Sequence, residues 1–97
     1  MQYDFEWDPQ KAVANRRKHR ISFEEAATIF QDPRMLTLYD RSHSRDEERW
    51  ITLGLSATGR LLVVNHTYLE TASDRVAIRI ISTRKATAPE RRQYQVE

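Results

Sequence analysis

The hydrophobic pattern of the first third of the chain predicts one strand followed by two helices. Aromatic and acidic residues alternate over residues 3–7, with the two-residue period of a half-buried strand. Asp8 and Pro9 are typical of a helix N-cap and of the first helical position, so a helix is expected through about residue 19. A second helix is predicted to start at the capping box that opens with Ser22, because apolar residues recur at helical spacing over 23–30.

From residue 35 onward the hydrophobic period changes to two, which indicates strands. A polar loop at 40–48, a hairpin turn at 57–59 and a turn at 70–74 separate four expected strands, at 35–39, 49–55, 61–68 and 75–83. Thr87 then caps a short C-terminal helix. The resulting order, β-α-α-β-β-β-β-α, predicts a single α+β domain over residues 1–97, with an antiparallel sheet and helices packed on one of its faces.

Two of the expected strands carry polar side chains among apolar ones. The even-numbered apolar residues of 76–80 share one face of the last strand, and Arg79 shares the other face with Thr83. Arg79 is then either a stray charge on a solvated face or part of a groove that binds an anion, and both interpretations stay open. Over 49–55, the odd-numbered apolar residues are expected to face inward, which leaves the even-numbered ones, Thr52 among them, outward.

Composition places the chain among globular domains with a heavily charged surface. Of its 97 residues, 39% are hydrophobic and 31% are charged, and there is no cysteine. Disulfides and thiolate metal sites are therefore excluded. No apolar run approaches the roughly 20 residues that a membrane span needs, and the acidic, aromatic N-terminus is not a signal peptide. These features predict a cytoplasmic protein that does not associate with membranes.

The positive charge is concentrated in the second half of the chain and is carried mainly by arginine. Residues 1–48 hold 8 Lys or Arg against 10 Asp or Glu, whereas residues 49–97 hold 8 against 4. Thirteen of the 16 basic residues are arginines. The planar guanidinium fork suits phosphate or carboxylate, so the composition favours an anionic partner.

The densest basic cluster is NRRKHR, residues 15–20, and no acidic residue lies between Asp8 and Glu24. One interpretation is that this cluster binds an anion. The other is structural, because cations at the C-terminal end of a helix are stabilised by the helix dipole. The sequence leaves both open.

No familiar catalytic or metal-binding motif is present. The chain lacks a G-x-S-x-G elbow, a glycine-rich phosphate loop and an H-E-x-x-H pair. The three histidines, His19, His43 and His66, lack the spacing of zinc ligands, so neither a metal nor another cofactor is expected. His43 lies in an acidic loop. His66 lies in an expected strand, where a histidine is more often structural than catalytic.

Five short motifs, in order, carry a further signal: FEWD, KHRISFEEA, HSRDEER, GRLL and RIISTRKA. In this order and spacing they resemble the BrnT family of type II toxins, over nearly the whole chain. Two departures are visible. Arg20 stands where the family usually has glycine, and the sequence at 65–67 is less typical.

The resemblance implies a RelE-like, microbial-ribonuclease-type fold and an RNA-cleaving toxin that arrests translation and growth. It also implies a partner, a BrnA-type ribbon-helix-helix antitoxin. The two proteins would form a hetero-oligomer that binds operator DNA through the antitoxin. An acidic or amphipathic antitoxin segment is expected to cover the basic groove and Trp50.

Metal-free RNA cleavage needs a base for the 2′-hydroxyl, an acid for the leaving oxygen, and cations around the phosphorus centre. The hypothesis drawn from the sequence assigns proton transfer or phosphate contact to Lys18 and His19, with His19 as the better acid or base. Three arginines would clamp the phosphate, namely Arg49, Arg79 and Arg84. Further RNA contacts are expected from Arg16, Arg17, Arg60 and Trp50. The hypothesis requires the catalytic groups to converge on one pocket.

Each candidate residue also has a structural interpretation. Lys18 and His19 could serve only as helix C-terminal charges, and Arg49 could be paired with Asp46 or Glu47. At the level of the whole protein, the alternative is a non-catalytic nucleic-acid-binding or co-repressor subunit that acts with a DNA-binding partner. A module that only docks an acidic protein segment is a third possibility.

Overall fold

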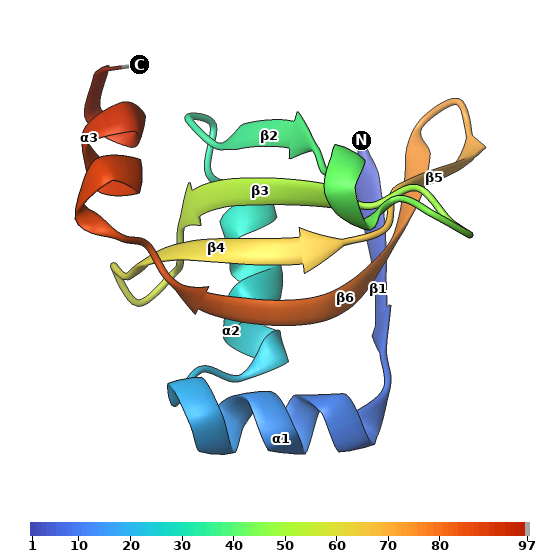
Figure 1. Ribbon diagram of the computed structural model, residues 1–97. Coiled ribbons are helices and arrows are strands. Elements are labelled where there is room, and N and C mark those ends of the chain that lie inside the picture. The colour runs from blue at the N-terminus through green and yellow to red at the C-terminus, as the bar shows by residue number, and fades with distance from the viewer. Residues whose placement is uncertain (97) are drawn as a thin grey trace.

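One mixed six-stranded sheet forms the centre of the molecule (Figure 1). The computed structural model describes residues 1–96 of the chain. In chain order the elements are β1 (Gln2–Trp7), α1 (Pro9–His19), α2 (Phe23–Ala27), the 3-10 helix η1 (Thr28–Gln31), β2 (Leu36–Tyr39), the 3-10 helix η2 (Arg41–His43), β3 (Trp50–Leu55), β4 (Leu61–His66), β5 (Leu69–Ala72), β6 (Arg75–Lys85) and α3 (Ala88–Val96).

The sheet has the strand order β1-β6-β4-β3-β2, and β5 pairs with the first residues of β6. The α+β class is confirmed, but two details of the prediction are wrong. The sheet is mixed, because β1 lies parallel to β6. Pairing between the two ends of a chain leaves no trace in local periodicity. In addition, β5 occupies part of the expected turn at 70–74. All four of its residues are exposed, so the sequence there lacks the alternation of apolar and polar residues that predicts a strand.

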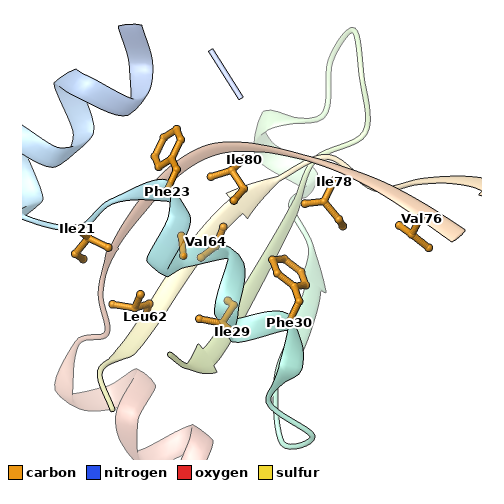
Figure 2. Packing of buried hydrophobic residues seen from close by; sticks show 10 residues of the cluster. Ile21, Phe23, Ile29, Phe30, Leu62, Val64, Val76, Ile78 and Ile80 are labelled. Atoms are coloured by element: carbon orange, nitrogen blue, oxygen red, sulfur yellow. The ribbon is translucent and has the colours of Figure 1, made fainter. Parts of the chain in front are cut away.

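The main core lies between the sheet and the segment formed by α2 and η1. Phe23 and Ile29 from this segment are fully buried against Leu62, Val64 and Ile78 of the sheet. Figure 2 shows the side chains of the two layers facing one another. The predicted common face of the even-numbered residues of 76–80 is confirmed, because all three are buried in this core. This core fixes β4 and β6, two neighbouring strands in the interior of the sheet.

A second, smaller core lies on the opposite face of the sheet, so the prediction of helices on one face only is wrong. Tyr94 of α3 packs there against Leu53, Leu61 and Val63. Because β3 is covered on both faces, burial along it does not follow polarity. Thr52, expected outward, is fully buried in the layer between sheet and α2. Its hydroxyl tolerates burial because it is hydrogen-bonded.

A β-bulge in β6 changes which side chains share a face. Asn65 pairs with Ser82 but His66 pairs with Ile80, so one extra residue is inserted into β6 at position 81. Beyond the bulge the parity reverses. Thr83 turns into the main core and Arg84 turns to the opposite face, beside Val63. The prediction that Thr83 shares a face with Arg79 is therefore wrong.

The helix ends follow the local sequence signals closely. Asp8 caps α1 by accepting a hydrogen bond from the backbone N–H of Gln10 at 2.8 Å. Ser22 caps α2, accepting from the backbone N–H of Glu25 at 3.0 Å. Asn15 of α1 accepts from the backbone N–H of Thr83 at 3.1 Å, so α1 lies beside the second half of β6, past the end of β1.

Candidate active site

The face of the sheet opposite α2 is only partly covered by α3. We call this surface the arginine face. It carries Asn65 of β4, Arg79 and Ser82 of β6, and Arg49, which directly precedes β3. The loop 40–48, with η2, lies in front of one end of the sheet (Figure 1). Between this loop and the strands lies a depression of about 170 Å³, which Asp40, His43, Arg49, Asn65, Ile81 and Ser82 line.

Two arginines of this face converge on one carboxylate. Arg79 Nη2 forms a hydrogen-bonded ion pair with Glu47 Oε1, and Arg49 Nη2 lies 3.7 Å from the same oxygen. The Nε atom of Arg49 is buried and has no hydrogen-bond partner within residues 1–96. Glu47 also joins two neighbouring depressions, because it lines the one with Arg79 and the one with Arg49 and His43. Two guanidinium groups thus approach one carboxylate oxygen, and the buried Nε donor of Arg49 is unused within the described residues, while Glu6, Asp46 and Glu48 also line these depressions.

The loop that carries Glu47 is closed at its base by hydrogen bonds. The backbone N–H of Asp40 donates to the carbonyl of Arg49 at 2.8 Å. Ser44 Oγ accepts from the backbone N–H of Arg49 at 2.9 Å and donates to the carbonyl of Asp40 at 2.6 Å. Ser44 therefore joins the two ends of the loop and holds η2 over the sheet.

Within this loop, His43 forms a pair with Asp40. His43 Nδ1 lies 2.9 Å from Asp40 Oδ2, and Ser42 Oγ donates to Asp40 Oδ1 at 3.0 Å. Burial raises the pKa of Asp40, but the hydrogen bonds from Ser42 and His43 outweigh burial and leave this pKa below its ordinary value. The imidazole itself is 68% exposed. No catalytic role was predicted for His43, although it belongs to the HSRDEER motif.

Arg84 lies on the same face as Arg79, but its guanidinium is engaged elsewhere. Its two Nη atoms donate to the two carboxylate oxygens of Glu90 at 2.8 and 2.9 Å. The Arg84 guanidinium holds the pKa of Glu90 at about 2. Glu90 also accepts from the backbone N–H of Thr87, which confirms the capping box of α3. Arg84 therefore ties α3 to the end of β6.

The basic residues of α1 lie apart from this site. Arg16 and Arg17 line a separate shallow depression on the helix, together with Val13 and Arg20. Lys18 and His19 occupy the last turn of α1 and line none of the depressions that Arg49 or Arg79 lines. The structure thus brings Arg49 and Arg79 together but does not bring the α1 residues to them. The expected convergence of all the catalytic candidates on one pocket is therefore not found among the described residues, and a role of Lys18 and His19 in proton transfer stays a prediction.

The remaining predicted RNA contacts have close protein partners. Arg60 donates from Nε to Glu25 at 2.8 Å and pairs with it through Nη2 as well. Trp50 is half-buried, with its ring centroid 5.1 Å from that of Tyr39 and 6.2 Å from that of Tyr68. It pairs with the buried His66 and lies on the α2 side of β3, away from the arginine face.

His66 has the structural role that its strand position favoured. Its Nε2 lies 2.7 Å from Thr52 Oγ1, and its Nδ1 lies 2.8 Å from the carbonyl oxygen of Thr67. Since a carbonyl only accepts, Nδ1 carries the proton and Nε2 accepts from the Thr52 hydroxyl. Burial lowers the pKa of His66, which keeps the ring neutral inside the core.

Two general features of the described residues complete the description of the site. Over residues 1–96, no helix has the length and apolarity to cross a membrane. In the same part of the chain, no three His, Cys, Asp or Glu side chains gather closely enough to hold a metal ion.

Comparison with known proteins identifies the family. A family model described as "Ribonuclease toxin, BrnT, of type II toxin-antitoxin system" matches residues 7–90. The 1.1 Å crystal structure of the Brucella abortus ribonuclease toxin BrnT is similar with a TM-score of 0.61 at 18% sequence identity, over 90% of this chain and 99% of that chain. This likeness shows a shared fold. A search of curated protein sequences gave no significant match. The match of the family model over most of the sequence shows that the chain belongs to the BrnT family of ribonuclease toxins of type II toxin-antitoxin systems.

Proposed function

We propose that this protein is a metal-independent endoribonuclease that cleaves RNA at the arginine face and thereby inhibits translation and growth. Membership of a ribonuclease toxin family supports the reaction class. The observation that supports the site is the convergence of Arg49 and Arg79 on Glu47, beside the buried and unpartnered Nε of Arg49. In this proposal, the carboxylate occupies the place that a phosphodiester takes in the complex with RNA.

The chemistry of cleavage explains why two arginines at one point matter. Attack of a 2′-oxygen on phosphorus builds up negative charge on the non-bridging oxygens in the transition state. Guanidinium groups bind such oxygens with two parallel N–H bonds and stay protonated throughout. Arg79 lies in β6 and Arg49 directly precedes β3, so two different parts of the sheet position them for one phosphate. RNA displaces Glu47, which lies on a loop, rather than a group on the sheet.

The other basic residues are proposed to act outside this centre. Arg84 adds positive charge to the same face while it anchors α3 through Glu90. Arg16 and Arg17 offer a second contact for a longer RNA chain or for ribosomal RNA. His19 remains a competing candidate for proton transfer, and a substitution there belongs in the same assay. Because Arg60 and Trp50 hold structural contacts, their substitution is expected to lower stability as well as RNA binding.

The proposed partner is a BrnA-type ribbon-helix-helix antitoxin, which would carry the DNA-binding function of the complex. The arginine face continues into the edge strand β2, where Leu38, paired with Ile51, is 59% exposed. A cationic centre beside an apolar edge suits an acidic, amphipathic segment. Hydrogen exchange should then show added protection at residues 45–50 and 75–84 in the complex. Unchanged protection there would contradict this mode of inhibition.

The decisive experiment is a cleavage assay with purified protein, on naked RNA and on translating ribosomes, with and without a chelator. Cleavage that persists with the chelator is expected. Loss of cleavage on chelation would overturn metal independence. Binding to RNA without cleavage of either substrate would favour the alternative, a non-catalytic nucleic-acid-binding subunit. Salt dependence does not separate the two, because phosphate contacts weaken with salt in both cases.

A further inference from the structure

We infer that His43 is the general base of the cleavage reaction and that Asp40 positions it. This inference rests on the proposed ribonuclease function and names the proton acceptor that Arg49 and Arg79 cannot supply, since arginine stays protonated. It also differs from the assignment of His19, which lies in the last turn of α1 and outside these depressions.

The first argument is the tautomer of the imidazole. Asp40 is a buried carboxylate that already accepts a hydrogen bond from Ser42, and an ionised carboxylate can only accept. The contact of 2.9 Å between His43 Nδ1 and Asp40 Oδ2 therefore requires the proton on Nδ1. In the neutral ring the lone pair is then on Nε2. A carboxylate behind Nδ1 also stabilises the cation that forms when Nε2 accepts a proton.

The second argument is the position of the ring. His43 lines two adjoining depressions on the arginine face, and Arg49 lines both of them as well. The imidazole is open to solvent, whereas His66 is buried with both nitrogens engaged. Of the histidines, His43 is thus the one with an available nitrogen beside the proposed phosphate site. The hydrogen bonds of Ser44 hold its loop in place.

The proposed step balances in protons and bonds. Neutral His43 takes the proton of the 2′-hydroxyl at Nε2 while the 2′-oxygen attacks phosphorus and the bond from phosphorus to the 5′-oxygen breaks. The leaving 5′-oxygen takes a proton from water, and protonated His43 returns its proton to the hydroxide so formed. The products are a 2′,3′-cyclic phosphate and a 5′-hydroxyl end. No oxidant, reductant or metal enters this balance.

The rate should rise with pH as His43 loses its second proton. Charged and polar groups on every element around the ring affect where this happens. The loop contributes Asp40, Arg45, Asp46 and Glu47, Arg49 directly precedes β3, and β4 and β6 contribute Asn65 and Ser82. Acids and arginines nearly balance in this set. The group in hydrogen-bond contact with the ring is the carboxylate of Asp40.

The test uses the wild-type protein and four variants. His43→Asn keeps an N–H that can reach Asp40 but removes the base, and it should lower the cleavage rate by about 10²- to 10⁴-fold. His43→Ala should show the same loss, and added imidazole should restore part of the rate. Asp40→Asn should lower kcat with little change in KM, because an amide can present its N–H to the ring and no longer fixes the proton on Nδ1. His19→Gln, in parallel, tests the competing residue.

Each result has a defined meaning. Cleavage by His43→Asn near the wild-type rate would overturn the inference and leave His43 as part of the loop structure. A loss in His43→Ala that imidazole does not restore would also overturn it, since proton transfer is the function that imidazole can replace. If the wild-type protein cleaves neither naked RNA nor ribosome-bound RNA, the proposed function fails first. If it cleaves and only His19→Gln is impaired, the base is His19.

Discussion

Two pairs of glutamate and arginine on this protein have the same chemistry and different consequences. Glu25 of α2 and Arg60 of the β3–β4 hairpin form one pair, and Glu47 and Arg79 form the other. The carboxylate of Glu25 also accepts from the hydroxyls of Ser56 and Thr58, at 2.8 and 2.6 Å. Arg60 donates in addition to the backbone carbonyl of Arg20 at 3.3 Å. This pair closes a network in which each group has its partners.

The pair of Glu47 and Arg79 is open by comparison. Glu47 is 38% exposed and lies on a loop, and a second cation, Arg49, approaches the same oxygen from 3.7 Å. The buried Nε of Arg49 has no partner in the described part of the chain. A saturated ion pair in contact with two elements stabilises the fold, whereas an exposed pair with unused donors can exchange its carboxylate for another anion. The stabilising pair and the exchangeable pair consist of the same residue types. They differ in how many of their donors and acceptors are hydrogen-bonded.

The largest expected effect comes from breaking the open pair at its cation. Arg79→Gln should lower the rate of RNA cleavage by about 10²- to 10³-fold, which is the usual loss for one donor to a developing oxyanion. Its free energy of unfolding should change by only about 0.5 kcal/mol, since exposed pairs contribute little. Arg75→Gln is the matched control, because Arg75 lies on the same strand and also pairs with a carboxylate, that of Asp4.

Cleavage rates of folded protein, with unfolding by urea measured on the same samples, check both halves of this prediction. Equal rates for Arg79→Gln and Arg75→Gln would remove Arg79 from the proposed site.

Breaking the closed pair of Glu25 and Arg60 should lower stability and leave cleavage unchanged, the reverse of the effect expected for Arg79→Gln. Glu25→Gln leaves Arg60 half-buried without its charge partner, and should reduce the free energy of unfolding by about 2–3 kcal/mol. The cleavage rate per folded molecule should stay the same, because the network is distinct from the arginine face. Urea unfolding and a cleavage assay at a temperature where both proteins are folded test this. A loss of rate without loss of stability would show that the network serves the site.

The contrast between the two pairs also shows how far the sequence could predict this molecule. Caps and strands depend on neighbours in the chain, and the signals at Asp8, Ser22 and Thr87 were confirmed. The partner of a carboxylate depends on tertiary contacts. Glu25 was expected to complete a capping box and instead binds Arg60, 35 residues away. Nothing in the local sequence distinguishes these two outcomes.

The candidate site, like the fold, could be predicted from the sequence only in part. Arg79 stood out as a charge inside an apolar strand, and the structure places it with Arg49. The bulge at position 81, which brings Arg84 to the same face, arises from strand pairing and has no sequence signal of its own. No catalytic role was predicted for His43, because a loop without apolar residues has no periodicity from which the position of a side chain could be inferred. The α1 cluster gave the strongest charge signal and lies elsewhere.

Acid should weaken the closed pair within a defined pH range. The hydrogen bond from Arg60 lowers the pKa of Glu25 from 4.5 to about 2. A lowered pKa in the folded state adds stability above the unfolded value of 4.5, and this gain is lost as pH falls toward about 2. Because Arg60 is 34% exposed, solvent screening reduces the expected loss to about 1–2 kcal/mol.

Unfolding by urea at pH 6 and pH 3 measures this loss, and the Glu25→Gln variant is the control. The difference between the two pH values should be smaller in the variant by the contribution of Glu25. Glu90, whose pKa is also about 2, changes in the same direction in both proteins. An identical difference in the variant and the wild type would show that Glu25 does not contribute.

Removing the carboxylate of the open pair should increase RNA affinity. Glu47→Gln keeps the size of the side chain but frees Arg49 and Arg79 from a competing anion, so an uncleavable RNA should bind about 3- to 10-fold more tightly, in line with about 1 kcal/mol for an exposed ion pair. Fluorescence anisotropy at fixed salt measures the change. Weaker binding in this variant would show that Glu47 contacts RNA directly rather than occupying the place of its phosphate.

The smallest expected effect lies at the backbone next to the closed pair. Arg20 ends α1 with φ at 60° and ψ at 33°, in the left-handed region that favours glycine. Arg20→Gly should stabilise the protein by about 0.5–1 kcal/mol, because glycine adopts this conformation without the clash of a Cβ atom. The carbonyl that accepts from Arg60 is retained, so the Glu25 network stays complete. Thermal unfolding should show a higher midpoint with an unchanged cleavage rate. A lower midpoint would mean that contacts of the Arg20 side chain stabilise the fold by more than its left-handed backbone conformation destabilises it. The basic end of α1 would then have a structural role.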